Sequence, residues 1–119
     1  MSDRGMATAE IAVALPSLVL ITAMALWGVR AASIQLACTD AARSGARAAA
    51  RGESLTAVRE LVESGVPKEA TVQLHRDEAT VRVDISAPVA TAAAIGLPPV
   101  IVQAHAAAES EPGTPPPTP

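Results

Sequence analysis

Aromatic side chains are almost absent from this chain of 119 residues, which has one tryptophan, Trp27, and neither phenylalanine nor tyrosine. Nucleic-acid bases therefore have no ring platform on which to stack. The net charge is -3, from 9 basic and 12 acidic residues that are interleaved along the chain, so no basic field attracts a phosphate backbone. We expect no nucleic-acid partner.

Cysteine is equally scarce, because Cys38 is the only one. A single thiol excludes an internal disulfide and a cysteine-based zinc site, and leaves either simple packing or a link between two subunits. His75 and His105 lack the spacing of metal ligands. Together with Asp84 and Ser86 these histidines supply the residue types of a catalytic triad, but no sequence motif groups them. We therefore expect no enzyme, no metal and no cofactor.

What the chain does have is an uncharged run of 19 residues from Ile11 to Val29. A transmembrane helix needs roughly 17 to 25 such residues. Glu10 directly precedes the run, and a carboxylate there either has a partner or lies at the lipid headgroups. A plain single-pass anchor fits the hydropathy. A secretory signal cleaved near Ala31 fits less well, because the apolar core exceeds the usual ~7 to 15 residues and acidic residues precede it.

The residues around this run resemble a known processing site. Gly5 stands before Met6, and Glu10 is the fifth residue after the glycine, directly against the apolar segment. This arrangement is similar to the leader site of the type IV pilin superfamily. The segment from Gln35 to Glu53 resembles the TadE-like minor pilins of actinobacterial tight-adherence (Flp) pili. The resemblance covers the first half of the chain well and the second half loosely.

The resemblance implies a function. A prepilin peptidase would cut between Gly5 and Met6 at the cytoplasmic membrane face, and Glu10 would pair with the new amine of a neighbouring subunit. Pro16 would mark local melting of the helix during filament packing. Met6 and Ile11 stand where many related pilins have Phe and Tyr, and the second of these departures favours a minor, pseudopilin-like subunit.

The implied partners are the prepilin peptidase, other pilin subunits, a Tad-type assembly platform and membrane lipid. The N-terminus would be cytoplasmic and the head extracytoplasmic, and the assembled subunit would be part of a surface pilus. The competing class is a single-pass membrane protein that binds a partner through its extramembrane helix without polymerising.

The chain divides into four segments on this interpretation. They are a leader (1–5), a long helix (6–52, transmembrane over 11–29), a small head (53–108) and a proline-rich, extended tail (109–119). Small residues recur every four positions between Ala41 and Ala50, so another element is expected to pack closely on that face. Arg43, Arg47 and Arg51 form a basic stripe nearby, which either binds headgroups or acidic subunits or is a solvated face that pairs with Asp40 and Glu53.

The head is predicted to begin with a second helix. Ser54 can cap it, it continues through Glu63, and Gly65 and Pro67 end it. Its expected apolar face is composed of Leu55, Val58, Leu61 and Val62.

Strand signals follow the second helix. Apolar and polar residues alternate around Val72 and again around Val83, and Arg76 to Glu78 form the expected hairpin connection. A loop from Pro88 to Pro99 leads to a third strand, Val100 to Ala106. The uncharged stretch from Ile85 to Ala108 has 24 residues, but its prolines argue against a second membrane crossing. The expected fold class is α+β and pilin-like, with a three-stranded antiparallel sheet packed on the alanine-rich helix.

Overall fold

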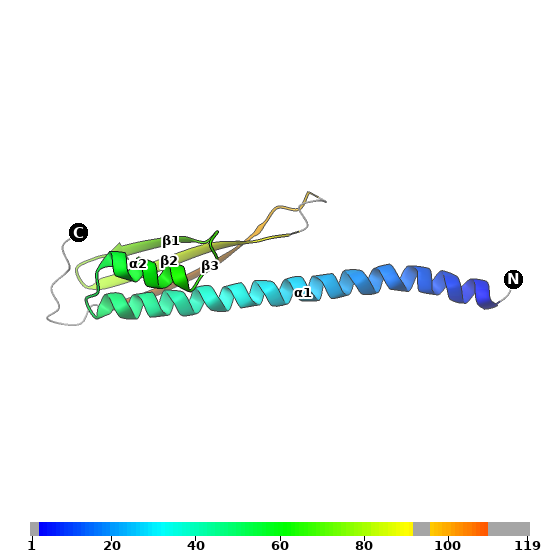
Figure 1. The fold of residues 1–119 in the computed structure, drawn as a ribbon, viewed down its shortest axis with the longest axis horizontal. Coiled ribbons are helices and arrows are strands. Elements are labelled where there is room, and N and C mark those ends of the chain that lie inside the picture. The colour runs from blue at the N-terminus through cyan, green and yellow to red at the C-terminus, as the bar shows by residue number, and fades with distance from the viewer. Residues whose placement is uncertain (1–2, 92–95, 110–119) are drawn as a thin grey trace. The chain divides into compact units, whose positions relative to one another are not determined.

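The computed structural model describes residues 3–91 and 96–109 (Figure 1). Two helices precede three strands: α1 (Asp3–Ala50), α2 (Leu55–Ser64), β1 (Thr71–Arg76), β2 (Thr80–Val89) and β3 (Val100–Glu109). The chain separates into two units, residues 1–30 and residues 31–119. The first contains the N-terminal part of α1. The second contains the rest of α1 together with α2 and the sheet, and the predicted α+β arrangement is confirmed.

Helix α1 begins at Asp3, whose carboxylate lies in the first turn, where the helix dipole favours negative charge. The helix therefore includes Gly5, which we had assigned from the sequence to a leader before the helix. At its other end, Gly52 has a φ of 89°. The Gly52 amide donates to the Ala49 carbonyl and the Glu53 amide donates to the Ala48 carbonyl. This pair of hydrogen bonds is a Schellman motif, which needs the left-handed conformation that glycine adopts without strain.

Helix α2 forms where its capping residues predict it. The Ser54 hydroxyl accepts a hydrogen bond from the Ala57 amide at 3.2 Å, and Gly65 follows the last helical residue. The predicted apolar face is only half correct. Val58 and Val62 are fully buried, whereas Leu55 and Leu61 are 36% and 43% exposed. The helix has ten residues, and only one narrow stripe of it faces the core.

The sheet is an antiparallel meander in the order β1-β2-β3. Two predicted boundaries were wrong. Arg76 belongs to β1 and not to the connection, which is closed by a bond from the Asp77 amide to the Thr80 carbonyl. Strand β3 continues beyond the predicted Ala106 to Glu109.

The prediction that a loop begins at Pro88 was also wrong, because β2 continues through it to Val89. Pro88 is paired with Ile101 on β3. In this register the backbone N of even-numbered β2 residues, Pro88 included, points toward β1 and not toward β3. Strand β1 begins at Thr71, opposite Ser86, and therefore does not extend as far as Pro88. The missing N–H of Pro88 therefore leaves no acceptor unpaired, and the strand tolerates the proline.

One face of the sheet carries the hydrophobic core. Val81, Val83 and Ile85 of β2 are almost fully buried against α2 and the alanine-rich part of α1. The buried residues that α1 contributes are Cys38, Ala41, Ala42, Gly45, Ala46, Ala48 and Ala49. Their small size lets the helix backbone approach the sheet closely. The predicted packing of the sheet on this part of the helix is confirmed.

Candidate functional site

The first unit is the apolar, exposed N-terminal part of α1. Every described residue from Asp3 to Arg30 is exposed. Among the large apolar side chains from Ile11 to Val29, the exposed fraction ranges from 37% at Trp27 to 71% at Val13. This is the one described helix that is long and apolar enough to cross a membrane. Side chains of this kind require lipid or another protein around them.

Gly5 and Met6 lie close to the beginning of α1. A Cβ built on Gly5 would have no heavy atom within 4 Å, so the peptide bond between the two residues is open to approach. The Thr8 hydroxyl donates to the Arg4 carbonyl at 2.8 Å, which is one of few side-chain bonds in this turn. The first turn of a helix opens at little cost, because its amides have no partners within the helix.

Glu10 lies one turn further along and is exposed. Within residues 3–91 and 96–109, no basic side chain forms an ion pair with it. The segment that follows is uncharged up to Arg30. Glu10 is therefore a single carboxylate at the entrance to an apolar segment, without an ion-pair partner among the described residues.

Pro16 removes one backbone bond from the middle of the apolar segment, since proline has no N–H to donate to the carbonyl four residues earlier. That carbonyl belongs to Ala12. The helix nevertheless continues unbroken to Ala50. Next to the proline, the Ser17 hydroxyl donates to the Val13 carbonyl at 3.0 Å. The predicted weak point is thus a missing bond within an intact helix.

The basic stripe lies on the exposed side of α1. Arg51 forms an ion pair with Glu53, with 2.9 Å between its Nη2 and the carboxylate Oε1. Arg47 donates from its Nε to the Arg43 carbonyl at 3.4 Å. In the part of the chain that the structure describes, neither Arg43 nor Arg47 pairs with a carboxylate, so the predicted pairing with Asp40 does not occur. Exposed pairs such as Arg51–Glu53 contribute little stability.

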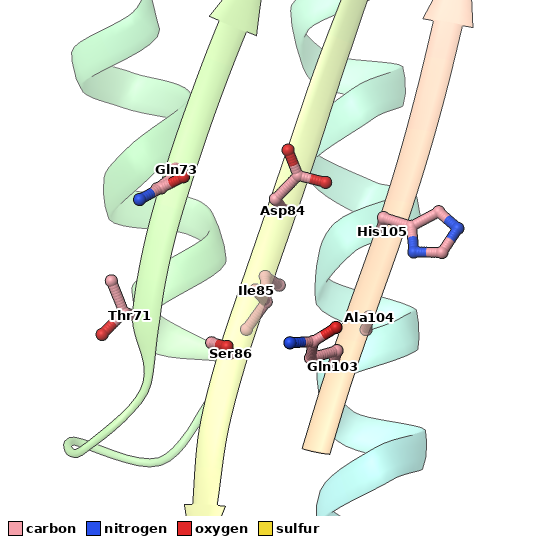
Figure 2. Close-up of a pocket in the computed structure, with 8 residues that line it drawn as sticks. All are labelled: Thr71, Gln73, Asp84, Ile85, Ser86, Gln103, Ala104 and His105. Atoms are coloured by element: carbon pink, nitrogen blue, oxygen red, sulfur yellow. The ribbon is translucent and has the colours of Figure 1, made fainter. Parts of the chain in front are cut away.

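Figure 2 shows Asp84, Ser86 and His105, three of the four residues of triad type, on the open face of the sheet. Asp84 lies opposite His105 in the register, and its Oδ2 is 3.8 Å from the Nδ1 of His75. Ser86 belongs to the next row of the sheet, opposite Thr71. These strands form a shallow hollow of about 260 Å³, lined by Thr71, Gln73, Asp84, Ile85, Ser86, Gln103, Ala104 and His105. No serine–histidine contact is present among the described residues, and no cluster of three metal ligands is found there.

Sequence reasoning missed this polar hollow as a unit. The cross-strand rows Gln73–Asp84–His105 and Thr71–Ser86–Gln103 depend on the hairpin register. The alternation of polar residues gave the face of each strand but not which residues stand opposite one another.

Cys38 is fully buried in the core, and burial raises the pKa of its thiol. The thiol has no exposed surface through which it could meet a second chain. Of the two roles that the sequence left open, packing is the one that fits this position.

Comparison with known proteins gives two matches and one negative result. The family described as TadE-like protein matches residues 5–47. The protein named apoptosis inhibitor Rv3655c, from Mycobacterium tuberculosis (strain ATCC 25618 / H37Rv), is 40% identical over 105 residues, which cover 88% of this chain and 79% of the relative. No solved structure matches the chain.

Proposed function

Because this chain belongs to the TadE-like family, we propose that it is a minor pilin or pseudopilin subunit of a tight-adherence type pilus. Membership makes it a pilus-related protein of a structural family, and α1 provides the segment that anchors it in a membrane. The proposal adds two steps. A prepilin peptidase removes the leader after Gly5, and the shortened chain then assembles through its N-terminal helix.

The observation that carries the proposal is the position of Glu10. It is a carboxylate without an ion-pair partner among the described residues, at the entrance to an exposed apolar helix and five residues after a glycine whose backbone is accessible. The family match begins at that same glycine. Cleavage between Gly5 and Met6 creates an amine on Met6, which is a cation. The Met6 amine of one subunit and the Glu10 carboxylate of the next then satisfy each other in an apolar setting, where each alone is costly.

Lateral assembly gives the apolar side chains of α1 a second environment besides lipid. Small residues allow close packing of helices in membranes, and the segment contains Ala23, Ala25 and Gly28. The Ala12 carbonyl, which Pro16 leaves without its helical donor, is a point where the helix can open to fit its neighbours. An ion pair fixes the register of such packing more than it stabilises it.

The proposed topology follows from the processing step. The peptidase acts at the cytoplasmic membrane face, so residues 1–5 lie in the cytoplasm and the α+β unit lies outside the membrane. The flank before the span contains Asp3 and Arg4, and with the amino terminus it is weakly positive, in accord with this orientation. Further partners are other pilin subunits and the Tad-type assembly platform. Arg43 and Arg47, exposed and without carboxylate partners among the described residues, offer a contact for acidic neighbours.

The test is the intact mass and N-terminal sequence of the protein extracted from its native membrane. We expect the wild-type chain to begin at Met6, and Gly5→Val to keep residues 1–5. Gly28→Val is the matched control, because a Cβ at Gly28 also has no atom within 4 Å. Glu10→Val is expected to begin at Met6 but to be missing from sheared filaments, whereas Thr8→Val is incorporated normally.

Three results contradict the proposal. A wild-type chain that begins at Met1 or Ser2 indicates a plain anchor, which binds its partner without polymerising. A chain that begins near Ala31 indicates a secretory signal, and the helix would then be discarded. Normal incorporation of Glu10→Val into filaments removes the ion pair from the mechanism, even if processing occurs after Gly5.

A further inference from the structure

The end of the sheet where β2 and β3 meet is apolar and exposed. Leu97 is 52% exposed, Val100 43% and Ile101 52%. Val100 and Ile101 are consecutive on β3, so their side chains lie on opposite faces of the sheet. Residues 96–101 read Gly-Leu-Pro-Pro-Val-Ile and include no charged side chain. We call Leu97, Val100 and Ile101 the apolar tip.

Two contacts fix the direction of β3 against the part of α1 in the same unit. Near the start of β3, the Gln35 Nε2 donates to the Gln103 carbonyl at 3.1 Å. Near its end, Ala108 is level with Arg76 through the pairing of both with β2, and the Arg76 Nη2 donates to the Ala49 carbonyl at 3.1 Å. The 14 helical residues from Gln35 to Ala49 span about 21 Å, and the five strand residues from Gln103 to Ala108 about 17 Å. Helix and strand therefore run in the same direction.

This direction places the apolar tip at the end of the unit where α1 enters it. Ala31 is four residues before Gln35, about 6 Å along a helix. Val100 is three residues before Gln103, about 10 Å along a strand. Val100 is thus at least roughly level with Ala31 along this direction, and Leu97 precedes it by three residues. Ala31 directly follows Arg30, the first charged residue after the apolar segment.

From this geometry we propose that the apolar tip inserts into the surface of the lipid bilayer that α1 crosses. If Ile11 to Val29 occupy the membrane, Ala31 lies at its surface, so chain connectivity brings the end of the unit that carries the tip to the bilayer. The occupant is lipid because the tip lies at the end of its own unit where the chain arrives from the apolar segment, whose last residue is Val29. It also lacks the charged groups that a polar protein surface would match. The inference rests on membrane anchoring, not on leader cleavage or polymerisation.

The backbone around the tip has several polar groups that either have a hydrogen-bond partner or are missing altogether, which favours an environment with little water. The Thr91 hydroxyl is within hydrogen-bond distance of two carbonyls in this segment, 3.1 Å from that of Leu97 and 2.9 Å from that of Pro98. Pro98 and Pro99 have no N–H that would need a partner. Fewer unsatisfied polar groups reduce the cost of leaving water, which otherwise opposes the insertion of a loop. Interfacial segments bury apolar side chains about 5–10 Å into the headgroup region.

The experiment measures lipid contact at single labelled positions in the full chain. An environment-sensitive fluorophore is attached to Leu97→Cys, Leu61→Cys or Leu20→Cys, each in a Cys38→Ala background, and the protein is reconstituted in phosphatidylcholine vesicles with brominated acyl chains. Leu61 is the matched control, because it is 43% exposed on α2 beside Val62, which faces Gly45. Leu20 reports on the membrane segment. Circular dichroism verifies that each labelled chain keeps its helix and strand content.

We expect quenching by brominated lipid at position 97 to be at least about threefold greater than at position 61, and to approach that at position 20. Equal weak quenching at 97 and 61, with strong quenching at 20, overturns the insertion while leaving the anchor intact. The label at position 97 could instead be shielded from water without being quenched, with a shielding that decreases as the protein is diluted in lipid. That result overturns lipid insertion in favour of contact with a second protein copy. Absence of quenching at 20 removes the premise of anchoring and the proposal with it.

Discussion

Gly45 is the one glycine of α1 at which an added Cβ would meet other side chains, and replacing it with alanine tests the close approach of helix and sheet. A Cβ at this position would collide with the Cγ2 of Val62. It would also lie 3.5 Å from the Cγ2 of Val83 and 3.6 Å from the Cγ1 of Val58. All three valines are fully buried and rotate with difficulty about χ1, so the side chains cannot simply turn away.

The expected magnitude comes from two opposing terms. Alanine in place of glycine stabilises a helix by about 1 kcal/mol. Overpacking a well-filled core costs about 1–3 kcal/mol. Gly45→Ala is therefore expected to lower the free energy of unfolding by up to about 2 kcal/mol, a large loss for a small domain. Ser44→Ala, at the exposed neighbouring position, gains helix propensity without the collision and is the control.

A double-mutant cycle with Val62→Ala identifies the cause. Val62→Ala alone costs about 2 kcal/mol, because two buried methyl groups are lost. In that background the new Cβ has room, so Gly45→Ala is expected to become neutral or stabilising. Urea unfolding of the full chain in detergent, followed by far-ultraviolet circular dichroism, gives the coupling energy, expected at about 1–3 kcal/mol. Additive effects of the two substitutions would refute the collision as the reason for glycine at this position.

Two further predictions concern Arg76, which is partly buried, and the buried thiol of Cys38. Arg76→Met removes the hydrogen bonds from the Arg76 Nη2 to the Ala49 carbonyl, in the last turn of α1, and to the Glu53 carbonyl, just beyond the helix. It is expected to lower the free energy of unfolding in urea by about 1–3 kcal/mol, against less than about 0.5 kcal/mol for the exposed Arg82→Met, and equal losses would contradict the capping role. Burial raises the pKa of the Cys38 thiol, which leaves less thiolate at any given pH. Alkylation of Cys38 at pH ~8 is therefore expected to be at least about tenfold slower in the folded chain than in urea. Rapid labelling of the folded chain would show instead that the thiol is accessible.

Local patterns predicted most of the elements, because their signals lie within a few residues of each other. Ser54 and Gly65 bound α2 through caps that need only nearby amides. The alternation around Val83 gave the buried face of β2. Pro88 was misjudged because its cost depends on where β1 begins, which is a property of the register and not of the sequence around the proline.

The role of Arg76 also depends on residues far from it in the sequence. As part of a charged triplet, Arg76-Asp77-Glu78, it was assigned to the connection. In the fold its guanidinium is partly buried and donates to carbonyls 23 and 27 residues away. A charged residue can end a strand at the core when a helix terminus supplies acceptors. No local pattern indicates where that terminus will lie.

The candidate site divides in the same way. Gly5 and Glu10 could be selected from the sequence, because their spacing and the apolar run beside them are local. The polar hollow needed the pairing of three strands, and the importance of Leu97 needed the direction of β3 against α1. Both features depend on contacts between residues far apart in the chain.

The contact between Gln35 and Gln103 joins residues 68 positions apart, and it has a consequence for the order in which the protein forms. At ~5–20 residues per second, synthesis needs roughly 3–14 s to pass from one to the other. The alanine-rich face of α1 therefore leaves the ribosome seconds before β3 exists to cover it, and such distant pairings also fold slowly. This face of the helix is synthesised first, and its cover is complete only when β3 has been made.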